Sequence, residues 1–222
     1  MNKFFNIWLL FIAIISIPFT LAVGLNEDFH FLGYKIQGEE FIYKKQFFLI
    51  IAGLAFLLGA LKASKKWMGI KIVKQTQRFK FSTPISKSRI KRVLLYNLIE
   101  LVFFLLFGLF FSFLSSESLF LGFVFFILFA EHLLNTIQGI KNKRYRVAMT
   151  SKALLRVDRE ISVIYFKGLE KIATKQQTLY FHYNNDLLLH LPLDVIPEER
   201  FNEFISTLKS IVDPDKVYFE NL

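Results

Sequence analysis

The chain has 222 residues, of which 54% are hydrophobic and 28 are Phe, and it is therefore more apolar than an ordinary soluble domain. It contains no Cys, which excludes disulfides, Cys-ligated zinc and thiol nucleophiles. The net charge of +10 is concentrated in residues 62–93, which hold eleven Lys or Arg and no acidic residue, so the charge indicates a basic loop beside a membrane rather than a nucleic-acid-binding domain.

The first two of four predicted transmembrane helices precede this basic loop. Residues 4–23 are uncharged and long enough to cross a hydrocarbon core of about 30 Å, although a cleaved signal peptide is an alternative interpretation. Residues 46–64 are the second predicted span, in which three small residues at every fourth position predict a packing face: Ala55, Gly59 and Ala63. Residues 24–45 lack a basic excess and are expected outside the cytoplasm, with their aromatic side chains at the interface.

The basic loop at residues 62–93 fixes the predicted orientation, because Lys and Arg next to membrane spans stay in the cytoplasm. Both chain ends are then cytoplasmic. Within the loop, residues 69–81 predict a β-hairpin or strand pair, with a disordered basic linker as the alternative. The basic residues expected at an anionic membrane surface are Lys65, Lys66, Lys71, Lys74, Arg78, Lys91, Arg92, Lys141, Lys143, Arg144 and Arg146.

Residues 93–114 and 118–137 predict a transmembrane helical hairpin with a very short connection. Each residue adds 1.5 Å along a helix, so residues that are equally far from the connecting turn lie at the same depth in the two helices. Several polar residues are placed in this way. They form a predicted intramembrane polar cluster of Asn97, Glu100, Glu131, His132 and Asn135. Ionisable residues inside a membrane are candidates for ion, proton or ligand sites, but this cluster is also explained as a structural lock of the hairpin or as a partner contact.

Residues 1–140 are the predicted membrane domain, and residues 141–222 are a predicted cytoplasmic domain. The boundary lies where the sequence changes from long apolar segments to a mixture of polar and apolar residues. Alternating residues predict six short strands: 145–150, 153–159, 161–166, 169–173, 178–183 and 187–193. The last two form a hairpin that sets Leu179, Phe181 and Tyr183 against Leu191, Leu189 and Leu187, all six on one buried face. A helix opening at Pro197 follows, with an apolar stripe that covers the sheet.

The segments YRVAMTSKALLRV and IPEERFNEFISTL, at the two ends of residues 145–212, resemble the opening hairpin and the strand-to-helix ending of bacterial pleckstrin-homology-like modules, including the YcxB-like membrane proteins. The resemblance implies a PH-like fold of antiparallel strands closed by a C-terminal helix, in a bacterial inner-membrane protein. It implies a binding or scaffolding module. That fold usually has seven strands, and a strand from residues 69–81 would complete the count.

No phosphate-binding loop, metalloprotease helix or nucleophile elbow occurs in the chain, so no catalytic residue, metal ligand or cofactor is predicted. The leading hypothesis is a non-catalytic membrane protein whose cytoplasmic module engages a partner protein or the anionic membrane surface. The alternatives are an oligomeric transporter or ion- or proton-coupled subunit that uses Glu100, Glu131 and His132, and a membrane-embedded enzyme that uses the same residues. The sequence names neither the ligand nor the oligomeric state.

Overall fold

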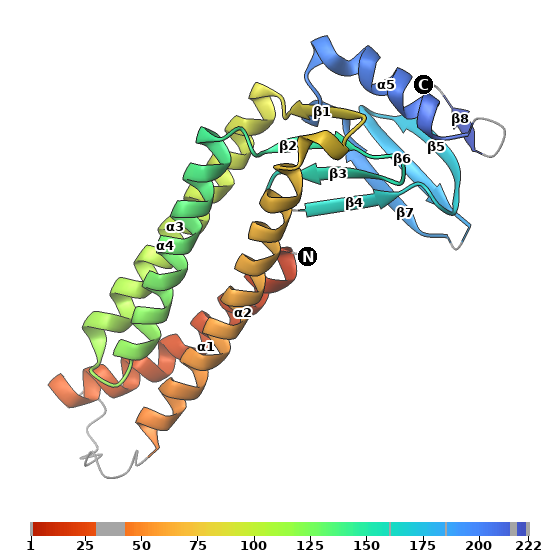
Figure 1. Cartoon of the computed structure of the whole chain (residues 1–222). Coiled ribbons are helices and arrows are strands. Elements are labelled where there is room, and N and C mark those ends of the chain that lie inside the picture. Colours follow the sequence, from red (N-terminus) through yellow and green to blue (C-terminus); the bar gives the residue numbers. More distant parts are fainter. Residues whose placement is uncertain (1, 30–42, 160, 185, 214–216, 221–222) are drawn as a thin grey trace. The chain divides into compact units, whose positions relative to one another are not determined.

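The computed structural model describes residues 2–29, 43–159, 161–184, 186–213 and 217–220 (Figure 1). The chain forms two compact units. The helical unit comprises Met1–Lys65 and Asn97–Asn135, and the sheet unit comprises Lys66–Tyr96 and Thr136–Leu222. Each unit is therefore assembled from two separate stretches of the sequence.

Four long helices occupy the positions of the four predicted spans. They are α1 (Asn2–Phe29), α2 (Lys44–Val73), α3 (Lys87–Leu114) and α4 (Leu119–Lys141). Each contains a segment that is long and apolar enough to cross a membrane. A helix satisfies all its backbone hydrogen bonds internally, which is the requirement for a segment surrounded by lipid.

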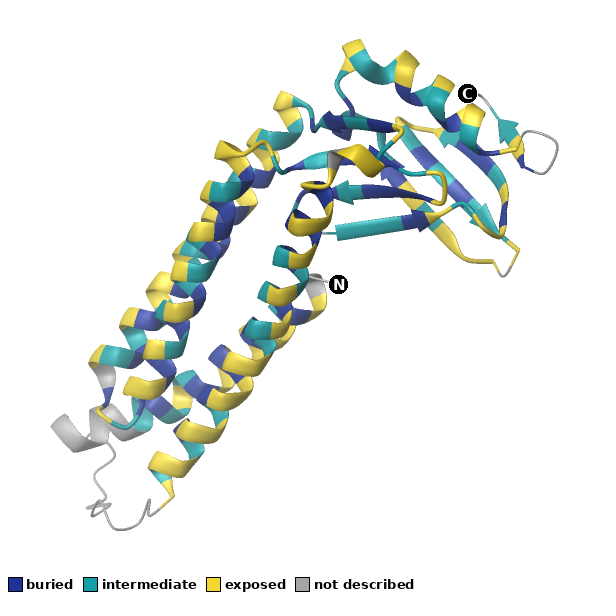
Figure 2. Cartoon of the chain, viewed as in Figure 1, coloured by how far each residue is buried: buried dark blue, intermediate teal, exposed yellow. Residues whose placement is uncertain are grey.

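The helices are buried along the side where they pack against each other and exposed along the other (Figure 2). Between 28% and 44% of each apolar segment is buried inside the protein. Ile7, Leu98 and Phe113 are more than half exposed, whereas Phe48 and Phe125 are fully buried in the shared core. Outward apolar surface of this extent is typical of a membrane protein.

The strand pair predicted for residues 69–81 is wrong, and so is the alternative of a disordered linker. Helix α2 continues to Val73, a short 3-10 helix η1 covers Thr76–Arg78, and only β1 (Phe81–Pro84) is a strand. Ile70 and Val73 are buried at a helical spacing of three, while Ile72 is exposed. The apparent alternation of Ile70 and Ile72 was therefore part of a helical pattern.

The sheet unit contains two four-stranded sheets, with strand orders β1-β2-β3-β4 and β7-β6-β5-β8. The further strands are β2 (Arg146–Met149), β3 (Ala153–Val157), β4 (Ile161–Tyr165), β5 (Leu169–Lys175), β6 (Thr178–Tyr183), β7 (Leu188–Pro192) and β8 (Tyr218–Glu220). All pairings are antiparallel except that of β5 with β8, which is parallel. All six predicted strands are present. Two further strands are also present, β1 in one sheet and β8 in the other.

Strand β1 pairs with β2 over Phe81–Met149 to Pro84–Arg146, although the whole α3–α4 hairpin separates them in the sequence. The predicted pairing of β6 with β7 is confirmed, with Leu179 opposite Leu191 and Phe181 opposite Leu189. One residue of that prediction is wrong: Leu187 is 47% exposed, because it belongs to the turn before β7.

The core of the sheet unit lies between the two sheets and the C-terminal helix α5 (Phe201–Ile211). Phe204 and Leu208 of α5 are fully buried, and the Phe204 ring lies 5.6 Å from that of Phe81 on β1. The helix begins later than predicted, because Pro197 precedes a 3-10 turn, η3 (Glu198–Arg200), instead of opening the α-helix. Another 3-10 turn, η2 (Leu193–Val195), follows β7. Strand β1 is thus a full member of the core.

Candidate functional site

A buried ion pair joins α2 and α3 in the helical unit. Lys62 Nζ lies 2.7 Å from Glu100 Oε2, and the two residues are 4% and 8% exposed. Lys62 Nζ also lies 5.4 Å from the centre of the Phe104 ring. A buried charge is costly unless it is paired and hydrogen-bonded, so each of these two residues needs the other.

Asn6 of α1 connects both members of this pair. Its Oδ1 accepts a hydrogen bond of 2.6 Å from Lys62 Nζ, and its Nδ2 donates one of 2.8 Å to Glu100 Oε1. On α4, His132 Nε2 lies 3.6 Å from Glu100 Oε2 and is 1% exposed. Asn6, Lys62, Glu100 and His132, called here the Lys62–Glu100 cluster, therefore draw one polar side chain from each of the four helices.

The structure brings together part of the predicted intramembrane polar cluster. Glu100 and His132 meet, as their equal distances from the turn predicted. Asn97 and Asn135 are 4% and 5% exposed at the neighbouring level, while Glu131 is only partly buried. Among the residues that the structure describes, the side-chain nitrogen of Asn135 has no hydrogen-bond partner.

Sequence reasoning missed Asn6 and Lys62. Lys62 is the only charged residue of the second predicted span, residues 46–64, but it also begins the predicted basic loop, residues 62–93, and the predicted polar cluster does not include it. Asn6 is the one amide side chain within the uncharged segment of residues 4–23. A polar residue in such a helix predicts a buried partner, but nothing in the sequence identifies which helix supplies it.

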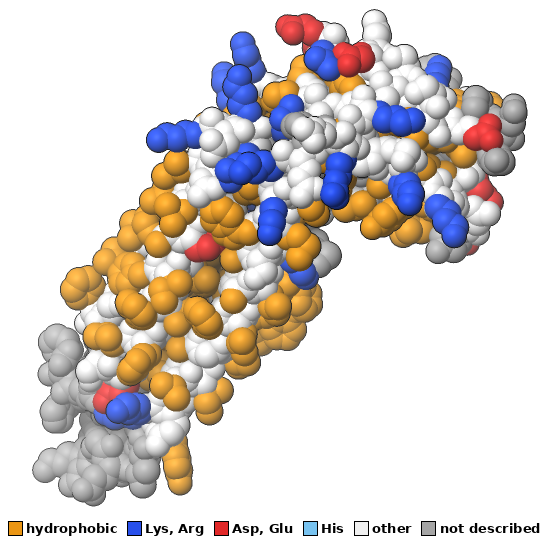
Figure 3. Space-filling view, in the orientation of Figure 1, with side chains coloured by type: hydrophobic (Ala, Val, Ile, Leu, Met, Phe, Trp, Pro, Cys, Tyr) orange, Lys and Arg blue, Asp and Glu red, His pale blue; other side chains and the backbone are white. Residues whose placement is uncertain are grey.

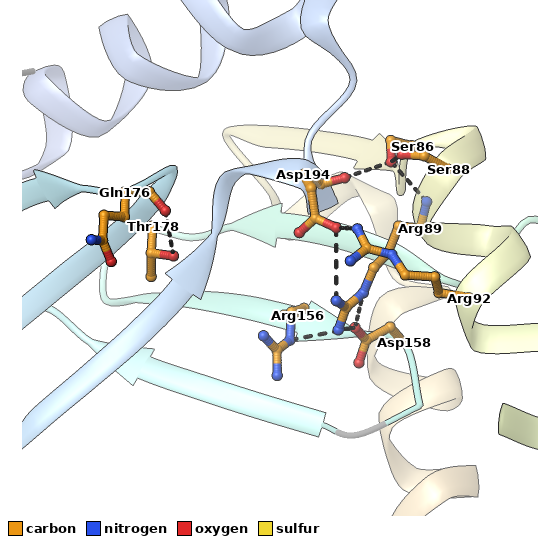
Figure 4. Close-up of polar contacts among 9 residues, drawn as sticks. All are labelled: Ser86, Ser88, Arg89, Arg92, Arg156, Asp158, Gln176, Thr178 and Asp194. Carbon is orange, nitrogen blue, oxygen red and sulfur yellow. Dashed lines mark hydrogen bonds and ion pairs between the residues drawn. The ribbon is translucent and has the colours of Figure 1, made fainter.

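A second polar network lies in the sheet unit, where α3 begins (Figure 4). Ser86 caps the helix, since its Oγ accepts a hydrogen bond of 3.1 Å from the Arg89 backbone nitrogen. Arg89 donates from Nη2 and Nε to Asp158 Oδ2, at 2.8 and 3.1 Å. Asp194 receives a salt bridge from Arg92, and its carbonyl oxygen accepts a hydrogen bond from Ser86 Oγ at 2.5 Å.

This group of five residues, Ser86, Arg89, Arg92, Asp158 and Asp194, is called here the Arg89 network. The Asp158 side chain is 1% exposed and follows β3, whereas Asp194 follows β7 in η2. Strands β3 and β7 belong to different sheets. The network therefore fixes the first turn of α3 to both sheets of the unit.

Most of the basic residues that the sequence assigns to a membrane surface lie on the sheet unit. On the face shown in Figure 3, Lys and Arg side chains gather over that unit, and hydrophobic side chains cover the long helices. The exposed members are Lys71, Lys74, Arg78, Lys91, Arg92, Lys141 and Lys143. Lys65, Arg144 and Arg146 are half-buried, and Lys66 is 9% exposed and contributes little to the surface.

In the part of the chain that the structure describes, no three or more His, Asp or Glu side chains are placed to hold a metal ion. The arrangement can pair charges and attract anions.

No protein-family model matches this chain, and neither a curated protein nor a solved structure is significantly similar to it. The functional argument therefore depends on the chain's own residues and geometry.

Proposed function

We propose that this chain is a non-catalytic protein of the bacterial inner membrane, with a cytoplasmic PH-like binding module placed at the anionic membrane surface. One observation carries the proposal: the α3–α4 hairpin is inserted between the paired strands β1 and β2. The binding module therefore cannot be separated from the apolar helices without breaking its own sheet. We therefore expect the module to bind its ligand while it is anchored by these helices.

The strand count supports a PH-like module. With β1 included, four antiparallel strands form one sheet and β5, β6 and β7 form the next, and helix α5 follows them. This is the seven-strand count of the family that the sequence resembles. Strand β8 is an addition to that pattern.

Exposed basic residues of the sheet unit support a contact with anionic headgroups. Lys91 lies in the second turn of α3, Lys141 is the last residue of α4 and Lys143 follows it, so these charges lie at the helix ends that belong to the sheet unit. Each Lys or Arg close to an anionic bilayer contributes about 1 kcal/mol of attraction. The same charges favour cytoplasmic placement of the sheet unit.

The Lys62–Glu100 cluster supports a structural role for the intramembrane charges over ion or proton transport. Glu100 is paired directly with Lys62 and hydrogen-bonded to Asn6, so its charge is compensated within the protein. A site that binds and releases an ion would have to break this pair in each cycle. We therefore propose that the cluster holds the four helices together.

The headgroup contact is tested with the full-length chain in nanodiscs of neutral lipid alone and in nanodiscs that contain an anionic phospholipid. We expect slower backbone hydrogen exchange at residues 139–146 in the anionic lipid, and we expect the effect to weaken at high salt. The triple variant K91E, K141E and K143E should abolish the difference.

The control changes two exposed Lys residues at the other end of sheet β1-β2-β3-β4. Lys152 and Lys167 are exposed at the β2–β3 and β4–β5 turns, and the register places these turns at the end of the sheet away from Arg146. The double variant K152E and K167E should keep the lipid-dependent protection. Equal exchange in the two lipids for the natural chain would contradict the proposed contact.

A further inference from the structure

The edge of sheet β7-β6-β5-β8 is closed by a segment from the end of the chain. Strand β5 would be an edge strand without β8, because its other side pairs with β6. The described part of the β5–β8 ladder contains three parallel pairs: Lys171 with Tyr218, Ile172 with Phe219 and Ala173 with Glu220. A segment that follows α5 thus occupies the backbone hydrogen-bonding groups of β5.

Alternate side chains of this segment make different contacts. Val217 is 6% exposed in the core, and Phe219 packs against the same core. On the other side, Glu220 Oε2 lies 2.8 Å from Lys171 Nζ, and Lys171 lies 5.7 Å from the centre of the Tyr218 ring. Backbone pairing combined with side-chain contacts at alternate positions is the way sheet edges recognise extended peptides.

The described interactions between β8 and β5 are weaker than those between β5 and β6. Its ion pair is exposed, with Lys171 and Glu220 side chains 37% and 41% accessible, and exposed ion pairs contribute about 0–1 kcal/mol. Parallel pairing is also slightly less stable per residue than antiparallel pairing. By contrast, β5 pairs with β6 at six positions.

We propose that the β5 edge is a strand-addition site for an extended segment of a partner protein, and that Val217–Glu220 occupies it as an internal competitor. The fitting segment carries apolar residues at the positions of Val217 and Phe219 and an acidic residue at the position of Glu220. This inference rests on the proposed function as a binding module, and it adds the class of partner and a means of regulation.

The test uses the full-length chain in detergent and a fluorescent peptide with the sequence of residues 217–222. In the first variant, F219S weakens the chain's own segment. In the second, A173C with E220C allows a disulfide to lock the segment in place, which is unambiguous because the natural chain has no Cys. Peptide binding is measured by fluorescence anisotropy, and folding is followed by circular dichroism.

We expect saturable binding to F219S, weaker binding to the natural chain, and loss of binding to the oxidised double-cysteine variant with recovery after reduction. A peptide with Ser in place of Phe219 should not bind. If F219S does not fold, the comparison of the reduced with the oxidised double-cysteine variant carries the test, because only the oxidised form locks the segment in place.

Binding to the locked variant that equals binding to the reduced one would overturn the proposal, and so would absence of binding to every folded open form. A cross-linked dimer on a non-reducing gel would overturn it as well, since a second copy would then supply the strand. These outcomes leave the nanodisc measurement unchanged, so failure of the strand site and failure of the membrane contact are distinguishable.

Discussion

Lys62 and Glu100 form a buried ion pair of 2.7 Å between residues that are 38 positions apart in the sequence. Their pairing couples α2 to α3, and Asn6 and His132 extend the contact to α1 and α4. The four helices thus meet at the Lys62–Glu100 cluster.

Breaking this pair from one side should be far more damaging than removing it completely. We expect K62M or E100M alone to lower the free energy of unfolding by about 3–5 kcal/mol, because each leaves a buried charge without its partner. The double variant should recover much of the loss. Thermal unfolding in detergent measures all three, with K45M as a control because Lys45 is exposed on the same helix. Additive losses in the double variant would show that the two residues do not act as a pair.

Asn6 should be required for stable attachment of α1. The N6A variant loses the hydrogen bonds to both Lys62 and Glu100, and we expect a loss of about 1–3 kcal/mol, because buried polar groups then lack partners. The neighbouring I7A variant is the control, since Ile7 is 64% exposed. The same contacts favour retention of the first helix, so intact-mass measurement should find it in the mature protein. A mature chain without residues 4–23 would contradict this expectation.

Gly122 should be essential for the close approach of α3 and α4. A Cβ at this position would lie 2.9 Å from the Gly108 carbonyl oxygen and 3.0 Å from the Ser112 nitrogen, and backbone atoms cannot turn away. We expect G122A to lower the melting temperature. The control G53A has nothing within 4 Å of the added Cβ and should be neutral. Equal melting temperatures for the two variants would exclude the proposed tight contact.

Glu117, in the turn between α3 and α4, should stabilise the fold down to strongly acidic pH. Burial raises its pKa, but hydrogen bonds from Lys44, Ser115, its own backbone and Ser116 outweigh burial and lower the pKa from 4.5 to about 2. Because the folded pKa is the lower one, the stabilisation is fully present above pH 4.5 and is lost as the pH falls through about 2.

The measurement for Glu117 compares E117Q with the natural chain across this range. The melting-temperature difference should be constant from neutral pH to about 4.5 and should disappear near pH 2. The K44Q variant should resemble E117Q, since Lys44 Nζ lies 2.9 Å from Glu117 Oε1. A difference that vanishes already above pH 4.5 would contradict the lowered pKa.

Local sequence patterns predicted those parts of the fold that depend on local spacing. The six strands from β2 to β7 follow from alternation, and the meeting of Glu100 with His132 follows from equal distances to a short turn. The prediction for residues 69–81 overlaps β1 only at Phe81, because a four-residue strand carries little alternation and its partner lies beyond the α3–α4 hairpin. Strand β8 has three residues, which is too short for any pattern to show.

The contacts of Asn6 and Lys62 could not be predicted for a different reason. Residues 30–42, which connect α1 to α2, lie outside the described residues, and a long connection does not fix the relative height of two helices. A short turn does fix it, as for α3 and α4. The Arg89 network likewise joins residues separated by 69 and 108 positions, and no spacing rule spans such distances.

The central claim is that the sheet unit lies on the cytoplasmic side of a membrane crossed four times. Single cysteines placed in the Cys-free chain test it with a membrane-impermeant maleimide on intact cells. Tyr43 and Ser151 are both exposed, the first beside α2 and the second in the β2–β3 turn. We predict that Y43C is labelled in intact cells and that S151C is labelled only after permeabilisation. Labelling of S151C in intact cells would contradict the account.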